Sequence, residues 1–461
     1  MSKLLRDKVN VLLIGGGARE HALALGLRRS KHLGELFITH PENAGLASVG
    51  RAVDVPVSIR EIYRLQQFCE KNHVGLVVIG PEEPLAQGYA DKLAAPGRSV
   101  FGPTADAARL EADKAWAKQL MRAASIPTGD ARIFTDVRTA RDYLQSREHP
   151  PQQTTTGKVT RLEASHAELP PVIKASGLAK GKGVIVPATF AEAYEALDRM
   201  LVKREFGEAG ERVVIEERLE GPEVSLLALV DGHNILPLPL CRDHKRLRDG
   251  DQGPNTGGMG AICPSNDLDE ETLRAVERDI LVPTVDAMRR EGIEFRGVLY
   301  AGLMLTPAGP RVLEFNCRFG DPECQPLVMR LKSDLLELMV ATCQGKLHEI
   351  DVEWDPRAAC CVVMASAGYP EKPRSGAEIQ GLEEAGRLAD VQVTIAGATR
   401  RRDGAVVTSG GRVLSVTALG ETPEAARKTA YAACNLISFE GAQWRRDIGQ
   451  SGGPPRGLVT T

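Results

Sequence analysis

The stretch VNVLLIGGGAREHALALGLRRSKHLGELFI, residues 9–38, places an apolar run, three glycines, a helical pattern and a second apolar run in succession. Buried strands that alternate with helices are typical of a parallel sheet covered by helices. The alternation continues through EIYRLQQFCEKN and GLVVIG as far as Pro103. We therefore predict an α/β fold that begins with an open parallel, Rossmann-like domain over residues 1–110.

The middle of the chain mixes helices with antiparallel strand pairs. One helical pattern covers residues 104–124. Farther on, the Asp-Gly pair inside SLLALVDGHNILPLPL is a hairpin turn signal. A second hairpin, GVLYAGLMLTPAGPRVLEFN, precedes one long helix expected over residues 326–343. These patterns predict a mixed α+β central domain, which we place at residues 111–345.

The last part of the chain reads as a separate unit. Short strands and the helical pattern TPEAARKTAYAACNLI predict a small mixed α+β C-terminal domain over residues 346–449. Residues 450–461 contain little that a core could bury, which predicts a disordered tail. Residues 147–171 are rich in Pro, Thr and Gln and lack apolar periodicity, so we expect a surface insertion there.

Composition narrows the possible function. The chain has 461 residues, and 58 Lys and Arg against 61 Asp and Glu give a formal net charge of −3. Binding to nucleic-acid phosphates needs clustered basic residues, so a nucleic-acid partner is not expected. No apolar run approaches the ~18 residues of a membrane helix, and nine scattered cysteines lack disulfide or zinc spacing. We expect a cytoplasmic protein with reduced thiols and no membrane partner.

The first candidate site is the glycine loop after the first apolar run. Gly17, Arg19 and Glu20 lie between a strand and a helix, where backbone N–H groups can approach an anion. Glu20 replaces the last glycine of the dinucleotide fingerprint, and no acidic residue ends the next strand. A phosphate or substrate loop is therefore favoured over a nicotinamide site, and a plain turn remains open. Glu82 and Glu83 follow a neighbouring strand, where they would accept from sugar hydroxyls or an amine or be solvated.

The second candidate is the glycine- and lysine-rich loop in VIKASGLAKGKGV. Lys174 and Lys182 flank glycines between two strands, which suits a loop folding over a polyphosphate. The pattern is not a P-loop, because GxxxxGK[ST] is absent. A solvated basic hairpin is the alternative interpretation.

The third and fourth candidates supply oxygens and charges. Glu314, Asn316 and Arg318 alternate along a strand, so they share one face, and carboxylate plus amide oxygens suit Mg²⁺. A solvated edge strand would look the same. In RDHKR, Asp243 and Lys245 precede a glycine-dense stretch and are expected to face polar substrate groups. The histidine between them could be a general base, but a solvated ring is the more common case.

Taken in order, these motifs resemble the phosphoribosylamine–glycine ligase family, ATP-grasp enzymes of purine biosynthesis, from about Val9 to Gly449. The resemblance rests on GGGAREHALA, PENAG, GPEEPL, FGPT, VIKASGLAKGKGV, VVIEERL, DHKRLRDGDQGPNTGGMGA, GVLYAGLM, EFNCRFGDPE and EGAQWRRDIG. The two longest blocks, beginning DHKR and EFN, are specific to the family. The resemblance implies an ATP-grasp central domain whose mobile lid covers about residues 125–215, with residues 147–171 inserted in it.

The resemblance also implies roles for single residues. Lys114 and Lys174 would hold the ATP phosphates, and Lys182 would belong to the glycine-rich lid. Glu216 and Glu217 would lie at the adenine-binding hinge, whose backbone reads the base edge, and Glu223 would take the ribose hydroxyls. Mg²⁺ or Mn²⁺ would be held by Glu314 and Asn316. The phosphoribosylamine and the site around it would involve Gly17, Arg19, Glu20, Glu82, Glu83 and Lys245. From their placement, Arg318 is expected to stabilise the transferring phosphoryl group or the tetrahedral intermediate, and Asp243 to orient an amine.

The sequence departs from the family pattern at a few positions. PGNAG is PENAG here, ADG is ASG at Ser176, and Cys317 and Cys324 stand in the EFN block. The family's FHAGT is TIAGA, so Ile395 replaces a histidine, which puts a role for this edge of the C-terminal domain in doubt.

The expected reaction is ATP-dependent ligation of glycine to 5-phosphoribosylamine through glycyl phosphate, by a monomer or weak dimer. Another ATP-grasp carboxylate–amine ligase would share the lysines and EFN but lack the DHKR block. A nicotinamide-dependent oxidoreductase would leave the lysine loop and the metal strand unexplained. A degenerate nucleotide-binding protein would be expected to lose lysines or metal ligands.

Overall fold

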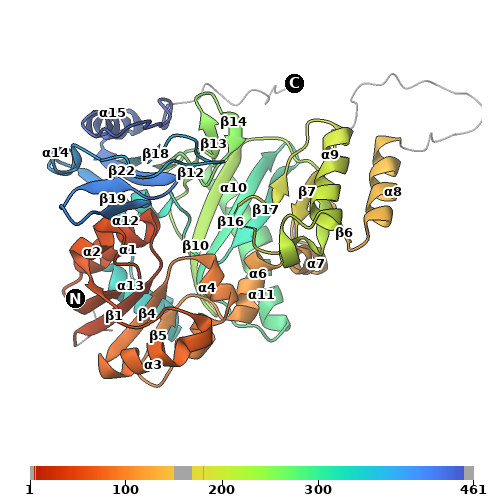
Figure 1. Cartoon of the computed structure of the whole chain (residues 1–461). Coiled ribbons are helices and arrows are strands. Elements are labelled where there is room, and N and C mark those ends of the chain that lie inside the picture. The colour runs from red at the N-terminus through yellow and green to blue at the C-terminus, as the bar shows by residue number, and fades with distance from the viewer. Residues whose placement is uncertain (1–4, 6, 150–168, 180, 451–461) are drawn as a thin grey trace, which may run out of the picture.

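The computed structural model describes Leu5 and residues 7–149, 169–179 and 181–450 (Figure 1). Most of the predicted insertion and nearly all of the predicted tail lie outside these residues. No helix within the described part of the chain is long and apolar enough to cross a membrane.

The N-terminal region forms the predicted parallel sheet, at the lower left of Figure 1. Its order is β3-β2-β1-β4-β5, and every neighbouring pair is parallel. The strands are β1 (Val9–Ile14), β2 (Leu33–Ile38), β3 (Arg51–Ala52), β4 (Val74–Ile79) and β5 (Ser99–Phe101). The helices are α1 (Ala18–Arg28), α2 (Ala44–Val49), α3 (Ile62–Lys71), α4 (Glu82–Ala86) and α5 (Tyr89–Leu93). The loops before α1 and α4 therefore share the carboxyl edge of the sheet.

The single helix predicted over residues 104–124 is two helices, α6 (Ala105–Ala112) and α7 (Lys114–Ala123). Thr104 caps the first by accepting from the Ala107 N–H. Asp113 interrupts the run, because its carboxylate accepts from the Trp116 N–H and so caps the second helix. The break places Lys114 at the start of α7.

The predicted lid region forms a sheet of its own at the right of Figure 1, of order β6-β9-β7-β8. It contains β6 (Ala131–Phe134), β7 (Val172–Ala175), β8 (Val184–Ile185) and β9 (Val213–Glu216), with helices α8 (Val137–Glu148) and α9 (Phe190–Leu197). All of its pairs are antiparallel.

Both predicted hairpins are confirmed in the central sheet, of order β11-β10-β16-β17. Its strands are β10 (Glu223–Asp231), β11 (Ile235–Pro237), β16 (Arg296–Thr306) and β17 (Gly309–Asn316), with α10 (Glu270–Val276) and α11 (Val282–Arg290) beside them. The single helix predicted over 326–343 is wrong. It is α12 (Cys324–Arg330) and α13 (Leu335–Gln344), because Leu331 pairs with Trp354 and Asp334 caps the second helix.

The C-terminal sheet has the order β12-β15-β18-β22-β19. Its strands are β12 (Arg242–Asp243), β15 (Gly260–Cys263), β18 (Ala358–Ala365), β19 (Val391–Ile395) and β22 (Arg412–Gly420), with α14 (Leu382–Gly386) and α15 (Pro423–Cys434). Two small hairpins join β13 (Arg246–Arg248) to β14 (Gln252–Asn255) and β20 (Ala398–Arg400) to β21 (Val406–Thr408). Two strands of the C-terminal sheet thus come from residues 242–263, and the domain ranges stay predictions.

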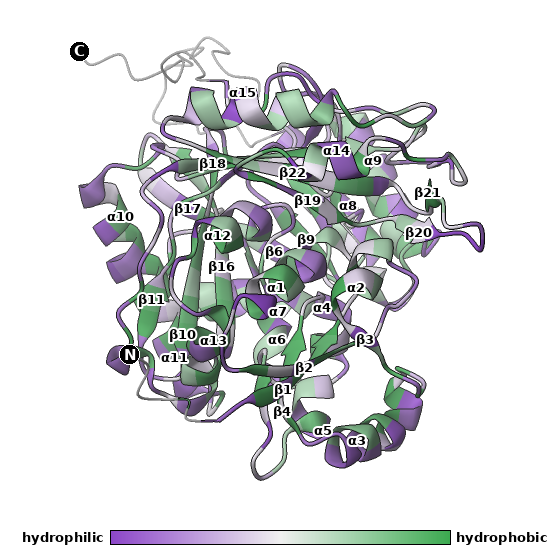
Figure 2. Cartoon of the chain, turned by 90° about the vertical axis from the view of Figure 1, so that its left-hand side faces the viewer, coloured by the Kyte–Doolittle hydropathy of each residue, from purple (hydrophilic) through white to green (hydrophobic). Residues whose placement is uncertain are grey.

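Apolar packing fixes the N-terminal sheet against the rest of the molecule. One buried cluster includes Val11 and Leu36 of that sheet together with Val328 and Leu335 from α12 and α13. In Figure 2 the strands β1, β2 and β4 are mostly green, which shows that they consist largely of hydrophobic residues. The N-terminal loops are therefore held beside the end of β17.

Candidate active site

A buried carboxylate, Glu216 at the end of β9, lies between two lysines. Lys174 Nζ is 2.7 Å from Glu216 Oε2 and donates to the Leu313 carbonyl at 3.1 Å. Lys118 pairs with Glu216 Oε1 and donates to Thr128 Oγ1 at 2.6 Å. Two ammonium groups against one carboxylate leave a surplus of positive charge where the lid sheet meets the central sheet.

A second carboxylate, Glu314 of β17, lies among the same cations. Burial raises the pKa of Glu314, but Lys245, Lys174 and Lys114 outweigh it and hold that pKa below its usual value. Burial in turn lowers the pKa of Lys114, whose Nζ is 3.5 Å from the Gly177 carbonyl, while Glu314 opposes this shift. Glu314 is therefore an ionised carboxylate facing lysines.

Lys245 connects this cluster to β10. Its Nζ is 3.0 Å from Glu223 Oε2. Burial alone would lower the pKa of Lys245, but the carboxylates of Glu223, Glu314 and Asp243 raise it above the ordinary value. The exposed carboxylate of Glu223 thus has a partner before any sugar hydroxyl approaches it.

Asp243 lies beside Lys245. Burial, and then the nearby carboxylate of Glu323, raise the pKa of Asp243 well above its usual value. Its Oδ1 is buried and has no hydrogen-bond partner among the residues that the structure describes. The carboxyl group of Asp243 therefore has one buried oxygen that no described group satisfies.

Arg318 joins the end of β17 to the N-terminal region. Its Nε is 3.3 Å from Glu82 Oε2 and its Nη2 is 3.0 Å from Glu111 Oε1. The same nitrogen contacts Asn316 Oδ1 at 3.3 Å. Burial alone would lower the pKa of Arg318, but the carboxylates of Glu111 and Glu82 raise it above its ordinary value. The guanidinium is thus fixed between α4, α6 and β17.

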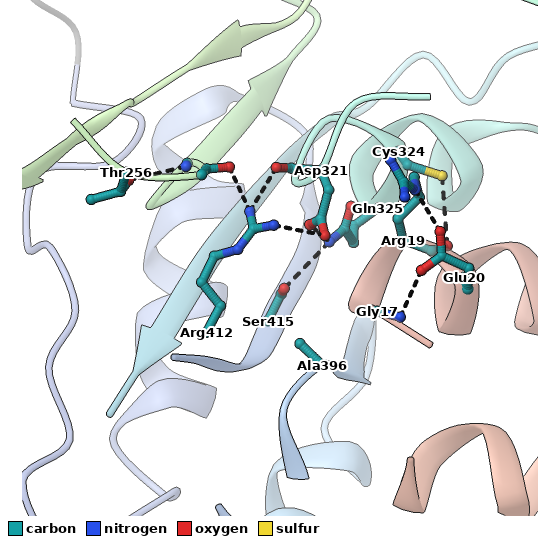
Figure 3. Close-up of polar contacts among 12 residues, drawn as sticks. Gly17, Arg19, Glu20, Thr256, Asp321, Cys324, Gln325, Ala396, Arg412 and Ser415 are labelled. Carbon is teal, nitrogen blue, oxygen red and sulfur yellow. Dashed lines mark hydrogen bonds and ion pairs between the residues drawn. The ribbon is translucent and has the colours of Figure 1, made fainter. Parts of the chain in front are cut away.

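The predicted glycine loop is partly closed by its own helix. The Gly17 N–H donates to Glu20 Oε2 at 2.6 Å, and Glu20 Oε1 lies 2.6 Å from Arg19 Nε (Figure 3). Arg19 Nη1 also donates to the Phe319 carbonyl at 3.0 Å. A dinucleotide pyrophosphate would have to displace Glu20, which argues against the oxidoreductase alternative.

Ile395 takes part in the contact between the N-terminal and C-terminal sheets through its backbone. Its N–H donates to His21 Nδ1 at 2.9 Å, and its carbonyl accepts from Asn43 Nδ2 at 2.9 Å. The same amide contacts the carbonyls of Gly16 at 2.8 Å and Ala396 at 3.0 Å. Replacing the family histidine therefore leaves these contacts possible, since they do not use the side chain of residue 395.

Some predicted residues lie apart from the site. Lys182 and Glu83 are exposed. The carboxylate of Glu217 accepts from the Asp130 N–H at 3.1 Å and lies 3.5 Å from Arg311, beside a cavity of about 1030 Å³. It does not join the lysine cluster around Glu216.

The histidine of RDHKR is buried, so the solvated interpretation is wrong. Burial, and then Arg445, lower the pKa of His244 to about 4, which leaves the ring neutral near pH 7.

Several contributing residues were not predicted. Lys118 had a signal in the sequence, because it follows Lys114 by four residues and shares its helix face. Glu111, His21 and Asn43 carried none, since their partners are distant along the chain.

Comparisons with known proteins identify the family of this chain. Models described as phosphoribosylglycinamide synthetase match the chain as the N domain at residues 9–111, the ATP-grasp (A) domain at 112–324 and the C domain at 359–451. Phosphoribosylamine–glycine ligase of Rhodopirellula baltica is 50% identical over 443 residues, covering 96% of this chain and 97% of that protein.

Solved structures give the same result. Phosphoribosylamine–glycine ligase from Thermotoga maritima matches with a TM-score of 0.78 and 32% identity, covering 95% of this chain and 100% of that one. A biotin carboxylase domain of the Hydrogenobacter thermophilus 2-oxoglutarate carboxylase, in complex with MgADP, shares the fold at a TM-score of 0.68 and 15% identity, covering 94% and 91%. Because family models match most of its length, the chain belongs to the phosphoribosylglycinamide synthetase family.

Proposed function

We propose that this chain catalyses ATP-dependent ligation of glycine to 5-phosphoribosylamine, giving glycinamide ribonucleotide, ADP and phosphate. The observation that carries the proposal is the lysine cluster around Glu216 and Glu314, joined by Arg318 to the N-terminal loops. Such an arrangement can hold a polyphosphate on one side and a second substrate on the other.

ATP would lie against the lysine cluster. Lys114 and Lys174 would contact its phosphates, with Lys182 approaching from the lid. Glu216 and Glu217 would border the base through the backbone of the hinge, since their carboxylates already have protein partners. Glu223 would reach the ribose and share it with Lys245, which lies 3.0 Å away.

A divalent cation, Mg²⁺ or Mn²⁺, fits the donor set at the end of β17. Glu314 is an ionised carboxylate and Asn316 offers an amide oxygen, and both are hard ligands. The described residues contain no group of three or more His, Cys, Asp or Glu side chains placed to hold a metal. When bound, the cation would offset the negative charge of the phosphates.

The chemistry begins with a carboxylate that resists attack by an amine. We propose that the glycine carboxylate attacks the γ-phosphorus, which forms glycyl phosphate and releases ADP. The amine of phosphoribosylamine then attacks the acyl carbon and expels phosphate. Arg318 would stabilise the negative charge that develops in these steps. Asp243 would orient a substrate amine, whose positive charge would favour the ionised carboxylate.

Phosphoribosylamine would bind at the N-terminal loops. Gly17, Arg19 and Glu20 border one side, and Glu82 lies beside Arg318 on the other. Glu83, one residue farther on, would reach it only from the exposed face of α4.

We propose a cytoplasmic enzyme that acts on small molecules as a monomer or weak dimer, without nucleic-acid or membrane partners. All nine cysteines lie in the described segments and are free thiols, as in a reducing compartment.

ADP release tests the proposal. ATP, Mg²⁺, glycine and phosphoribosylamine made in place from ribose 5-phosphate and ammonia are combined, and each is omitted in turn. We expect ADP release to need both glycine and the ribosylamine, with glycinamide ribonucleotide identified by mass spectrometry. Release with another acid or amine instead would contradict the proposal and indicate a related ligase.

A further inference from the structure

The glycine loop that follows β14 packs directly on Asp243. Gly258 has a φ of +107°, and a Cβ built there would lie 2.8 Å from Asp243 Oδ1 and 2.5 Å from Pro322 Cδ. The loop therefore packs between the unpartnered carboxyl oxygen of Asp243 and the turn at 321–322. A shift of this loop would move the wall of the amine site.

Groups of the C-terminal region hold this loop from outside. Arg412 Nη1 donates to the Gly257 carbonyl at 2.6 Å and to the Asp321 carbonyl at 2.7 Å (Figure 3). Its Nη2 lies 3.0 Å from Asp321 Oδ2. The Gly257 N–H donates to the Tyr369 hydroxyl at 2.9 Å. Both polar backbone atoms of Gly257 are thus bound by side chains encoded more than a hundred residues later.

Asp321 extends the connection to the N-terminal glycine loop. Its Oδ1 accepts from Gln325 at 2.9 Å, and a Cβ built on Gly17 would lie 3.6 Å from its Oδ2. Arg412 therefore fixes two loops at once, one beside Asp243 and one beside Gly17. Figure 3 shows these groups converging from three parts of the chain.

We propose that Arg412, assisted by Tyr369, is a positioning residue for both amine substrates, acting through the 256–258 loop and Asp321. The proposal rests on the proposed function. A guanidinium is required because its planar fork reaches two carbonyls and a carboxylate together, whereas an ammonium group is a point charge. Arg412 makes no ion pair with the cluster around Glu216 in the described structure, so we expect ATP binding to depend on it less than amine binding does.

Arg445 provides a matched control. It is a buried arginine of the C-terminal region, where Arg412 is half-buried, and it binds the same long segment at its far end, through Asp251 at 2.6 Å and the Arg246 carbonyl at 3.2 Å. It also pairs with Asp447. An effect on folding alone would appear equally in both arginine variants.

The test compares Arg412→Lys, Tyr369→Phe and Arg445→Lys by steady-state kinetics for all three substrates, with thermal unfolding of each variant. For Arg412→Lys we expect KM for glycine and for phosphoribosylamine to rise about tenfold, with KM for ATP within about twofold. Tyr369→Phe should act in the same direction, and the double variant should deviate from additivity because both groups hold Gly257. Arg445→Lys should lower thermal stability without this KM split.

The inference is overturned if Arg412→Lys and Arg445→Lys change the three KM values in the same way. It is also overturned if Arg412→Lys lowers activity only in proportion to the loss of folded protein. An inactive wild-type chain would instead remove the proposed function, and with it this role for Arg412.

Discussion

The two halves of the site hold their charges differently. On the side where we propose ATP, Lys118 and Lys174 share the single carboxylate of Glu216, so cations are in surplus. On the substrate side, Arg318 lies between Glu82 and Glu111, and Arg412 lies on Asp321. Lysine is a mobile point charge, whereas an arginine fork is fixed by its partners. The lysine half is therefore suited to receive charge and the arginine half to keep loops in place.

The largest effect is expected in the lysine half. Lys174→Met should lower kcat/KM for ATP by about 10³-fold, because it removes a cation from the phosphate site while Lys118 still pairs with Glu216. ADP release under limiting ATP measures it. Lys203→Met, at an exposed lysine, is the control and should stay near the wild-type rate. Near-normal ATP kinetics in Lys174→Met would contradict the role of the lysine half in receiving the phosphate charge.

Arg318 tests the arginine half. Arg318→Ala should lower the free energy of unfolding by about 3 kcal/mol, because the buried carboxylate of Glu111 and the half-buried one of Glu82 lose their partner. Arg318→Lys should restore much of that stability, yet turnover should remain about 10²-fold low without the fork. Urea unfolding and ADP release separate the two effects. Equal turnover in Arg318→Lys and the wild type would exclude Arg318 from the chemistry.

Acid should lower the free energy of unfolding, because two buried histidines are neutral in the folded chain. Burial lowers the pKa of His21 to about 4 from the ordinary 6.5, and burial with Arg445 does the same for His244. Their contribution is complete above pH 6.5 and is lost as the pH falls towards 4, because the unfolded chain then binds the extra protons. At pH 5 the loss should be about 2 kcal/mol for each ring. Urea titrations at several pH values measure this, and His21→Gln should show a shallower dependence.

The smallest effect is expected at Glu217. Glu217→Gln should change KM for ATP by less than about twofold and stability by less than about 0.5 kcal/mol, because its contact with Arg311 is partly exposed. The neighbouring Glu216→Gln should have a far larger effect, because it removes a buried charge between two lysines. Similar kinetics for the two variants would contradict the separation of the Glu217 carboxylate from the lysine cluster.

Much of the fold could be predicted from local patterns. The alternation in residues 9–38 predicts the parallel sheet, and both hairpins follow from turn residues and strand runs. The helix breaks at Asp113 and at Leu331 were missed, because a side-chain cap and a distant strand partner override helical propensity there. Local sequence does not contain those partners.

The candidate site divides in the same way. Spacing alone places Glu314 and Asn316 on one face of a strand, although a solvated edge strand would show the same pattern. Contacts such as Asn43 with Ile395, or Arg412 with Gly257, join residues that the chain brings together only on folding. Glu217 was expected at the nucleotide hinge through its backbone, and the structure directs its carboxylate to the Asp130 N–H and towards Arg311.

The sheet that combines β12 and β15 with three later strands limits where the chain can be split into two separately produced fragments. A break near residue 346 would part a chain that includes Asp243 from the strand to which β15 is hydrogen-bonded. Fragments made there would have to reassociate through an exposed sheet edge before the site existed, whereas fusions at either terminus would leave that sheet complete.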